Sequence, residues 1–300
     1  MKTMSEKPNL LCIDDDKRIL RSLKALFRST HNVYATTSPA EFTQLLSEHH
    51  MHVVISDQRM PEAQGTELLS FVKNMSPDTM RILLTGYADA DAVVDSVNES
   101  EIFCYIQKPW EIDEIRSIVQ QATDIAKRLE KLSDIEFIDG DDFEPFDELT
   151  FGDSVDVIDH RPRVLYLDKD DYSTQLFNDT FASNYDIFSL AEPARVAASV
   201  NAKDFAIAVI DATFTSDISS LIGKLKQENP LLLPIVLSHT NDSELLVTLI
   251  NKKQIFRFCN KDTLSSIEES LRVAVDESQR LLSEPKARLQ HLLIDGKGTP

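Results

Sequence analysis

The sequence predicts an α/β protein with two doubly wound, parallel-sheet domains. Short apolar runs alternate with amphipathic segments along the chain, and this order of segments occurs twice. Short apolar runs are typical of strands buried on both faces of a sheet, and their alternation with helices predicts right-handed crossovers. A length of 300 residues also suits two domains of roughly 150 residues each.

The first half contains four apolar runs that we assign to strands. They lie at residues 10–13, 53–55, 82–84 and 102–106. Apolar residues at helical spacing follow the first run at Ile19, Leu20, Leu23, Leu26 and Phe27, and follow the last run at Ile112, Ile115, Val119, Ala122, Ala126 and Leu129. We expect the last series to pack on its own sheet, although its heptad-like spacing would also suit a homodimer.

The second half repeats this order. Its apolar runs lie at residues 164–167, 205–210, 234–237 and 255–259. Polar residues at the strand ends recur at an almost constant offset, since 168 minus 14 and 211 minus 57 are both 154, while 238 minus 85 and 261 minus 108 are both 153. Four landmarks related by a single deletion indicate an internal duplication.

An acidic segment separates the two halves. Residues 134–160 contain 11 acidic residues and no Lys or Arg, which is typical of a flexible, solvated linker. We therefore divide the chain into a first domain at 1–133, the acidic linker, a second domain at 161–283 and a C-terminal tail at 284–300. An amphipathic patch in the tail predicts that the tail docks on the protein or frays.

The composition argues against several classes of partner and compartment. The formal charge is −19, and an acidic chain is poorly suited to bind nucleic acid or an anionic membrane, so we expect neither as a partner. Three widely separated cysteines without a CxxC pair indicate reduced thiols. Because the sequence shows neither a signal-peptide core nor a long apolar stretch, we expect a cytoplasmic protein.

Polar residues that could act together follow four strands of the first half. Asp14 and Asp15 follow the first strand, and the others follow later strands, at Asp57, Thr85 and Lys108. The carboxyl ends of parallel strands meet at one edge of the sheet, so we expect these side chains to surround one crevice. Three carboxylates in one crevice repel one another unless a cation is bound, and such a cluster suits Mg²⁺ or Mn²⁺. A phosphoryl group on Asp57 could then be bound by the metal, by Lys108 and by the Thr85 hydroxyl.

The motifs around these residues resemble the receiver domains of two-component response regulators. The motifs are LLCIDDD, VVISDQRMP, ILLTGYAD and YIQKPW, in the order and spacing of that family over residues 8–131. The resemblance implies a flavodoxin-type sheet of five parallel strands in the order 2-1-3-4-5. It also implies that Asp57 accepts a phosphoryl group from a histidine kinase or a phosphotransfer protein.

The same resemblance implies a role for each residue of the site. Asp14 and Asp15 would bind Mg²⁺, and Asp15 would be a direct ligand together with Asp57 and the backbone carbonyl of Arg59. Thr85 would be drawn toward the phosphoryl group and Lys108 would pair with it. Tyr105, three residues before Lys108, would be the aromatic switch residue that turns inward.

The second half retains only part of this pattern, and we expect it to be a degenerate receiver. The retained phosphoacceptor side consists of Asp211, Ser238 and Lys261. On the metal side, Asp168-Lys169 replaces Asp14-Asp15, so an ammonium stands where the direct Mg²⁺ ligand is expected, and Lys169 could pair with Asp211 instead. Metal-dependent phosphorylation should then be weak or absent. A one-residue shift of the loop would instead make Asp170 the missing ligand.

The sequence therefore predicts a response regulator of a phosphorelay and not an enzyme. Phosphorylation would switch a protein-interaction surface, and the second domain would serve as an interaction module for a downstream protein. The residues after 283 are too few for a DNA-binding or catalytic output domain, so we expect output through protein contacts. Two alternatives are a haloacid-dehalogenase-like phosphatase, built on Asp168-Lys169-Asp170 with Ser238 and Lys261, and a phosphate-independent scaffold.

Overall fold

The computed structural model describes residues 7–86, 102–133, 161–240 and 243–295. The acidic linker predicted at 134–160 and the last five residues of the tail lie outside the described residues. The chain divides into two compact units, of which the first contains Met1–Asp134 and Ser243–Lys253 and the second contains Ile135–Asp242 and Gln254–Pro300. The segment Ser243–Lys253 thus groups with the first unit, although the sequence pattern assigns it to the second domain.

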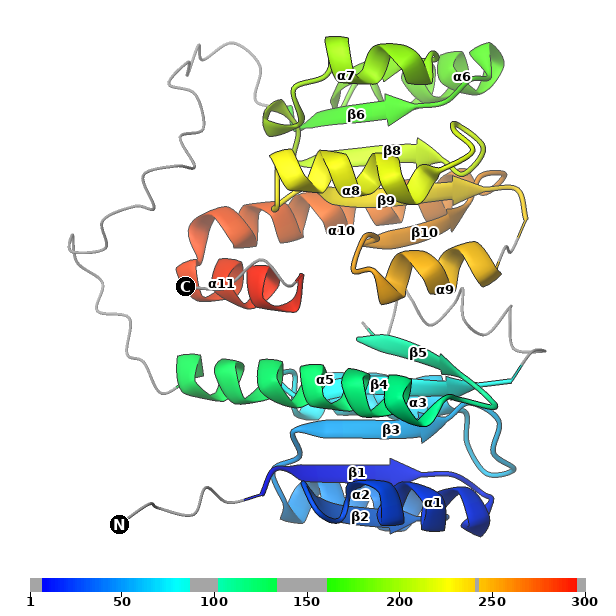
Figure 1. The fold of residues 1–300 in the computed structure, drawn as a ribbon. Helices are drawn as coiled ribbons and strands as arrows, with labels where there is room; N and C mark the ends of the chain where they lie inside the picture. Colours follow the sequence, from blue (N-terminus) through cyan, green and yellow to red (C-terminus); the bar gives the residue numbers. More distant parts are fainter. Residues whose placement is uncertain (1–6, 87–101, 134–160, 241–242, 296–300) are drawn as a thin grey trace, which may run out of the picture. The chain divides into compact units, whose positions relative to one another are not determined.

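The first unit is built on a parallel sheet of five strands in the order β2-β1-β3-β4-β5, as expected from the sequence. Its elements follow one another as β1 (Asn9–Ile13), α1 (Lys17–Phe27), β2 (Asn32–Thr36), α2 (Pro39–Glu48), β3 (Val53–Asp57), α3 (Gly65–Met75), β4 (Met80–Thr85), β5 (Cys104–Gln107) and α5 (Ile112–Ser133) (Figure 1). The helix α9 (Ser243–Asn251) groups with them.

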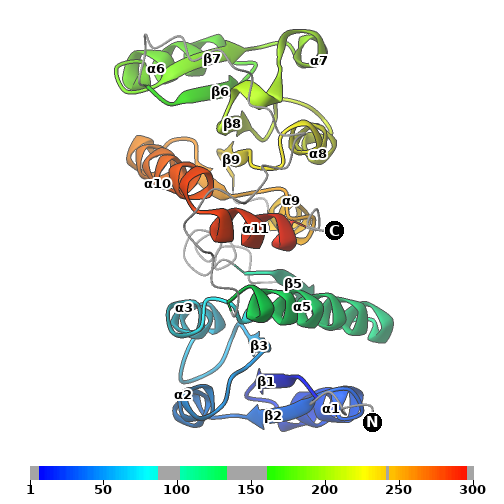
Figure 2. The same cartoon turned by 90° about the vertical axis from the view of Figure 1, so that its left-hand side faces the viewer.

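Helices cover both faces of the first sheet. α1 and α5 lie on one face and α2 and α3 on the other (Figure 2). Every residue of β3 and β4 is buried, which explains why these strands read as continuous apolar runs. In the predicted apolar series of α5, Ile112 is exposed, and the other five residues are buried, at Ile115, Val119, Ala122, Ala126 and Leu129. These five side chains pack within the unit, as expected for a helix that covers its own sheet.

The helix starts of the first unit follow local capping chemistry. The side chain of Asp16 accepts a hydrogen bond from the Arg18 amide at 2.8 Å and caps α1. At α2, Ser38 caps the helix and Pro39 occupies its first turn. Asp16 therefore serves the helix rather than the acidic cluster that precedes it.

The second unit has its own parallel sheet of five strands, in the order β7-β6-β8-β9-β10. Its elements are β6 (Arg163–Leu167), α6 (Asp171–Phe181), β7 (Asp186–Leu190), η1 (Pro193–Arg195), α7 (Val196–Ser199), η2 (Ala202–Asp204), β8 (Ile207–Asp211), α8 (Ile218–Glu228), β9 (Leu233–Ser238), β10 (Arg257–Asn260), α10 (Leu264–Ser283) and α11 (Pro285–Ile294). α6 and α10 lie on one face, and α7 and α8 on the other (Figure 2). This sheet repeats the strand order of the first.

The C-terminal tail forms a helix that docks on the second unit. α11 contacts α10, and Ala287 within it is buried. At the end of this helix, Asp295 forms an ion pair with Lys226 of α8, and both side chains are more than nine-tenths buried. Of the two expectations for the tail, docking is therefore the one observed for residues up to 295.

In the described parts of the chain, no helix combines the length and the apolar character needed to span a membrane.

Candidate functional site

The carboxyl edge of the first sheet brings together acidic residues from two strand ends. One carboxylate oxygen from each of Asp14, Asp15 and Asp57 lies within 4.8 Å of the others. Lys108 Nζ lies 2.8 Å from Asp14 Oδ2 and 2.6 Å from Asp57 Oδ1. The structure therefore gathers the four charged residues that the strand order predicts at this edge.

The backbone of β4 and β5 positions Lys108 at this cluster. The Lys108 amide donates to the Thr85 carbonyl at 2.8 Å, and the Lys108-Pro109 peptide bond is cis. Thr85 ends β4 and is buried. Tyr105 is also buried and lies on β5, opposite Leu83 of β4. The two proposed switch residues therefore lie on neighbouring strands behind the cluster.

The three carboxylates have different surroundings. Asp14 is buried, and both of its oxygens accept hydrogen bonds, one from the Asp16 amide at 2.8 Å and one from Lys108 at 2.8 Å. Asp57 is buried as well, whereas Asp15 is exposed. Asp14 thus orients the lysine, and the carboxylates of Asp15 and Asp57 are the better placed to meet an incoming cation.

The charge of the cluster is not balanced by its own residues. Three carboxylates and one ammonium give a formal charge of −2. Burial and the neighbouring Asp14 raise the pKa of Asp57, against the opposing effect of Lys108. Burial alone would lower the pKa of Lys108, but its bonds to Asp14 and Asp57 outweigh burial and raise that pKa, so the lysine stays charged. Hard carboxylate oxygens with excess negative charge fit a divalent ion such as Mg²⁺.

A glycine that the sequence motifs did not single out shapes the site from the start of α3. Gly65 begins α3, and a Cβ atom there would lie 2.2 Å from the Asp57 carbonyl oxygen, a distance that real Cβ atoms do not reach. The Gly65 amide donates to the Gln58 carbonyl at 3.0 Å, and the buried Gln58 side chain accepts from the Thr66 amide at 3.1 Å. The glycine therefore allows α3 to approach the backbone of Asp57. The QG pair before a helical pattern was the available sequence signal.

The second sheet carries a similar cluster at its own carboxyl edge. Lys261 Nζ lies 2.7 Å from Asp168 Oδ2 and 2.7 Å from Asp211 Oδ2, and all three side chains are more than nine-tenths buried. The Lys261 amide donates to the Ser238 carbonyl at 2.9 Å, as the Lys108 amide does to Thr85. Four of the five residues predicted for the second site, all except Lys169, are therefore brought together.

Additional donors occupy the carboxylates of this second cluster. The Tyr166 hydroxyl donates to Asp168 Oδ2 at 2.8 Å. Asp211 Oδ1 accepts from the Thr213 amide at 2.8 Å and also from the Thr213 hydroxyl. Although burial opposes it, the bonds from Lys261 and Thr213 lower the pKa of Asp211. Asp211 is therefore held as a carboxylate with its oxygens engaged.

The expected pair between Lys169 and Asp211 does not form within the described residues. Lys169 is exposed, and the lysine that bonds Asp211 is Lys261. Asp170 does not act as a shifted ligand either, since its carboxylate accepts from the Ser173 amide at 2.8 Å and caps α6. The physical reason is the helix start, because the residue two positions after the strand-end aspartate is needed as a cap in both units.

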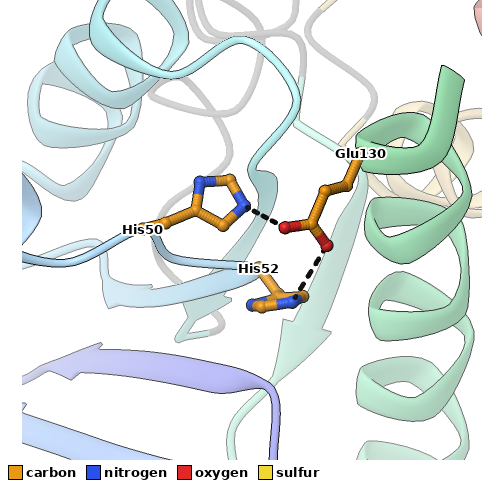
Figure 3. A group of neighbouring side chains, drawn as sticks. All are labelled: His50, His52 and Glu130. Atoms are coloured by element: carbon orange, nitrogen blue, oxygen red, sulfur yellow. Dashed lines mark ion pairs between the residues drawn. The ribbon is translucent and has the colours of Figure 1, made fainter. Parts of the chain in front are cut away.

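A third cluster lies at the opposite end of the first sheet. His50 follows α2, His52 precedes β3, and Glu130 projects from α5 toward both rings (Figure 3). The Glu130 oxygens lie 3.9 Å from His50 Nε2 and 3.7 Å from His52 Nε2. Because the Asn9 amide donates to His52 Nδ1 at 3.2 Å, the neutral ring carries its hydrogen on Nε2, which faces Glu130. A metal ion at Nε2 would need the other tautomer, so the geometry describes two imidazole rings beside a carboxylate and not a metal site.

Comparison with known proteins assigns the first unit to a family. Residues 10–120 match the response regulator receiver domain. A signal receiver domain of an HD domain-containing protein from Pseudomonas fluorescens Pf-5 is 29% identical, with 44% of this chain and 97% of that chain covered and a TM-score of 0.41. The family match at residues 10–120 supports a response regulator receiver domain in the N-terminal part of the chain.

Two longer relatives match the same region. The hydrogenase transcriptional regulatory protein HoxA of Bradyrhizobium diazoefficiens is 29% identical over 45% of this chain and 28% of its own length. The DNA-binding transcriptional regulator NtrC of Proteus hauseri is 30% identical over 39% of this chain and 25% of its own length. This chain thus spans about a quarter of the length of these relatives.

These relatives overturn the expectation that nucleic acid is excluded as a partner. Both are named as regulators of transcription, and one is named as DNA-binding. The expectation was wrong because it rested on the net charge of this chain and on the few residues after 283. Neither property bears on the three quarters of the relatives that the chain does not match.

Proposed function

We propose that the first unit is a phosphorylation-controlled receiver in which Asp57 accepts a phosphoryl group from a histidine kinase or a phosphotransfer protein. The observation that carries the proposal is the bridge of Lys108 between Asp14 and Asp57, next to the exposed Asp15. Asp57 is a buried carboxylate beside one ammonium and two further carboxylates. Such a perturbed charge environment is typical of a reactive carboxylate in a functional site.

Mg²⁺ or Mn²⁺ is the cofactor that this donor set suits. Asp15, Asp57 and the backbone carbonyl of Arg59 would hold the ion, and the ion would neutralise charge on the phosphoryl oxygens. Asp14 would keep Lys108 in place through the 2.8 Å bond between them. Lys108 and the Thr85 hydroxyl would bind the remaining phosphoryl oxygens.

The chemical step is a transfer with one bond formed and one broken. An Asp57 carboxylate oxygen attacks phosphorus and forms the acyl phosphate bond. The bond between phosphorus and the donor breaks, and the electron pair leaves with the donor group. The transfer occurs once per site, so the first unit would act as a switch and not as a turnover enzyme.

We propose that the second unit is a degenerate receiver that serves as an interaction module. Its parallel sheet repeats the strand order of the first, and Lys261 joins Asp168 and Asp211 at the equivalent edge. The exposed Lys169 stands in place of the second acid. With its carboxylates bonded by Lys261, Tyr166 and Thr213, this cluster is suited to hold one conformation.

The two alternative functions are less well supported by this geometry. In a haloacid-dehalogenase-like phosphatase, Asp168 would be the nucleophile, but both of its oxygens already accept hydrogen bonds, from Lys261, Tyr166 and the Asp170 amide. A phosphate-independent scaffold would not require the unbalanced charge at Asp57. The names of the relatives support the further proposal that the phosphorylation signal ends in the regulation of transcription.

Intact-mass spectrometry tests the proposed function. The full chain is incubated with acetyl phosphate and Mg²⁺, and we expect one added phosphoryl group, which EDTA prevents. Asp57→Asn should abolish the addition and Asp211→Asn should leave it unchanged. An added group that persists in Asp57→Asn would contradict the assignment of the acceptor, and release of phosphate from p-nitrophenyl phosphate with turnover would favour the phosphatase.

A further inference from the structure

The edge strand of the receiver sheet contacts a helix that comes from much later in the chain. β5 ends the sheet, so among the described residues one side of its backbone has no neighbouring strand. α9 contacts β5 and groups with the first unit. Only the residues Ser243–Lys253 of the second half belong to this unit.

A single side chain of α9 pairs with the backbone of the switch residue. The Tyr105 amide donates to Asn251 Oδ1 at 2.8 Å, and Asn251 Nδ2 donates to the Tyr105 carbonyl at 2.9 Å. The Cys104 thiol also donates to Asn251 Oδ1, at 3.2 Å. A carboxamide has the donor and acceptor of a peptide group, so Asn251 supplies both bonds that a neighbouring strand would make.

A second contact follows two residues after Asn251. Lys253 Nζ lies 3.5 Å from the centre of the Phe103 ring, which is within the range of a cation–π interaction. Lys253 has a φ of 56°, in the left-handed region that glycine usually occupies after a helix. A lysine at this position costs backbone strain, and its ammonium contacts the residue just before β5.

These contacts lie close to the charged cluster along the same strand. Tyr105 precedes Lys108 by three residues, and Lys108 bonds Asp14 and Asp57. A shift of β5 that accompanies a change at Lys108 would therefore alter the geometry of the Asn251–Tyr105 pair. By thermodynamic linkage, the pair would also alter the phosphorylation of Asp57.

We propose that β5 is a docking surface for residues Ser243–Lys253 of this chain, with Asn251 and Lys253 as its recognition residues, and that docking is coupled to the phosphorylation of Asp57. The coupling rests on the proposed function, whereas the docking does not. Two features identify Ser243–Lys253 as the docked segment. They are the two hydrogen bonds between Asn251 and the Tyr105 backbone and the Lys253 ammonium over the Phe103 ring.

The docking is tested by amide hydrogen exchange at Tyr105 in the full, unphosphorylated chain. We expect exchange at this amide to become at least tenfold faster in Asn251→Ala, while Thr248→Ala, an exposed residue of the same helix, serves as the control and leaves it unchanged. In Lys253→Gly the left-handed backbone is relieved of strain, so a merely structural role would predict unchanged or slower exchange. If α9 docks through Lys253, exchange at the Tyr105 amide should be about threefold faster in Lys253→Gly. Exchange rates equal to wild type in both Asn251→Ala and Lys253→Gly would overturn the docking.

The coupling is tested on the same amide after incubation with acetyl phosphate and Mg²⁺. We expect the Tyr105 exchange rate to change at least threefold in the wild type and not in Asp57→Asn. An unchanged rate in protein that carries the added mass would overturn the coupling alone. Absence of the added mass would overturn the proposed function and the coupling with it, while the exchange in Asn251→Ala would still decide the docking.

Discussion

The two sheet edges hold the same three side chains at nearly the same distances, but they differ around the central aspartate. Lys108 bonds its two carboxylates at 2.8 and 2.6 Å, and Lys261 bonds its two at 2.7 and 2.7 Å. The pKa of Asp57 is raised, mainly by burial, whereas the bonds from Lys261 and Thr213 lower that of Asp211 against the effect of burial. Matching ion-pair geometry is therefore accompanied by opposite shifts in the pKa of the central aspartate.

The surroundings of the two aspartates differ in two respects. Asp15 places a third carboxylate near Asp57, whereas the corresponding position of the second unit holds the exposed Lys169. Thr213 donates to Asp211 from both its amide and its hydroxyl. The first edge keeps an excess of negative charge that suits a bound cation, and the second edge satisfies its charges internally.

Removing the lysine at each edge should produce the largest difference in stability. We expect Lys261→Ala to lower the free energy of unfolding by about 3–5 kcal/mol, because two buried carboxylates lose the ammonium that bonds both of them. The Lys108 side chain is 23% exposed against 8% for Lys261, and burial raises the pKa of Asp57, which weakens the demand for a cation beside it. Lys108→Ala should therefore cost less, about 1–3 kcal/mol. Urea denaturation checks both variants, and an equal or larger loss in Lys108→Ala would break the comparison.

The free energy of unfolding of the first unit should depend on pH through a buried histidine, His31, as well as through Asp57. Burial lowers the pKa of His31 to about 4. The folded state therefore keeps His31 neutral, and its contribution is fully present above the ordinary pKa of 6.5 and is lost as the pH falls from 6.5 toward 4. We expect a loss of about 3 kcal/mol over this window. Denaturation at pH 7.5 and pH 4.5 should show a smaller difference in His31→Gln, and an unchanged difference would exclude His31 as its source.

Replacement of the central aspartates should change stability in opposite directions. Because the folded pKa of Asp57 is raised, its ionisation costs stability as the pH rises through that pKa, so Asp57→Asn should stabilise the metal-free protein at pH 7 by about 1 kcal/mol. The lowered pKa of Asp211 gives stability that is present above the unfolded value and is lost as the pH falls through the folded pKa. Asp211→Asn should therefore destabilise by about 1–2 kcal/mol at pH 7. Urea titrations in EDTA measure both, and effects of the same sign would contradict the distinction.

The smallest expected effect concerns the hydroxyl that only the second edge possesses. Tyr166 donates to Asp168 at 2.8 Å, and Cys12 stands at the corresponding position of the first strand, since 166 minus 154 is 12. Tyr166→Phe should lower the free energy of unfolding by about 1 kcal/mol, because Asp168 keeps its bond to Lys261. Cys12→Ala is the matched variant in the first unit and removes no bond to Asp14. Equal effects of Tyr166→Phe and Cys12→Ala would show that the hydroxyl adds nothing beyond packing.

Sequence patterns predicted the strand-end residues well. The strand-end aspartates and lysines were found because a parallel sheet collects its carboxyl ends at one edge, and the constant offset marked the repetition of Asp57 at Asp211. These features depend on near neighbours in the chain or on strand order.

Features that depend on tertiary packing were missed or wrong. The role of Gly65 depends on how closely α3 approaches the Asp57 backbone. The pair expected between Lys169 and Asp211 failed because Asp170 caps α6 and Lys169 faces solvent. The contact of Asn251 with Tyr105 joins residues separated by 146 positions, and no local pattern reports it.

Mapping the acyl phosphate to individual peptides tests the central claim most directly. The wild-type chain is treated with acetyl phosphate and Mg²⁺, reduced with borohydride to convert phosphorylated aspartate to homoserine, and digested for mass spectrometry. The account predicts homoserine at position 57 and unmodified aspartate at position 211. Comparable conversion at both positions, or conversion at Asp211 alone, would contradict the claim that the two edges differ in reactivity.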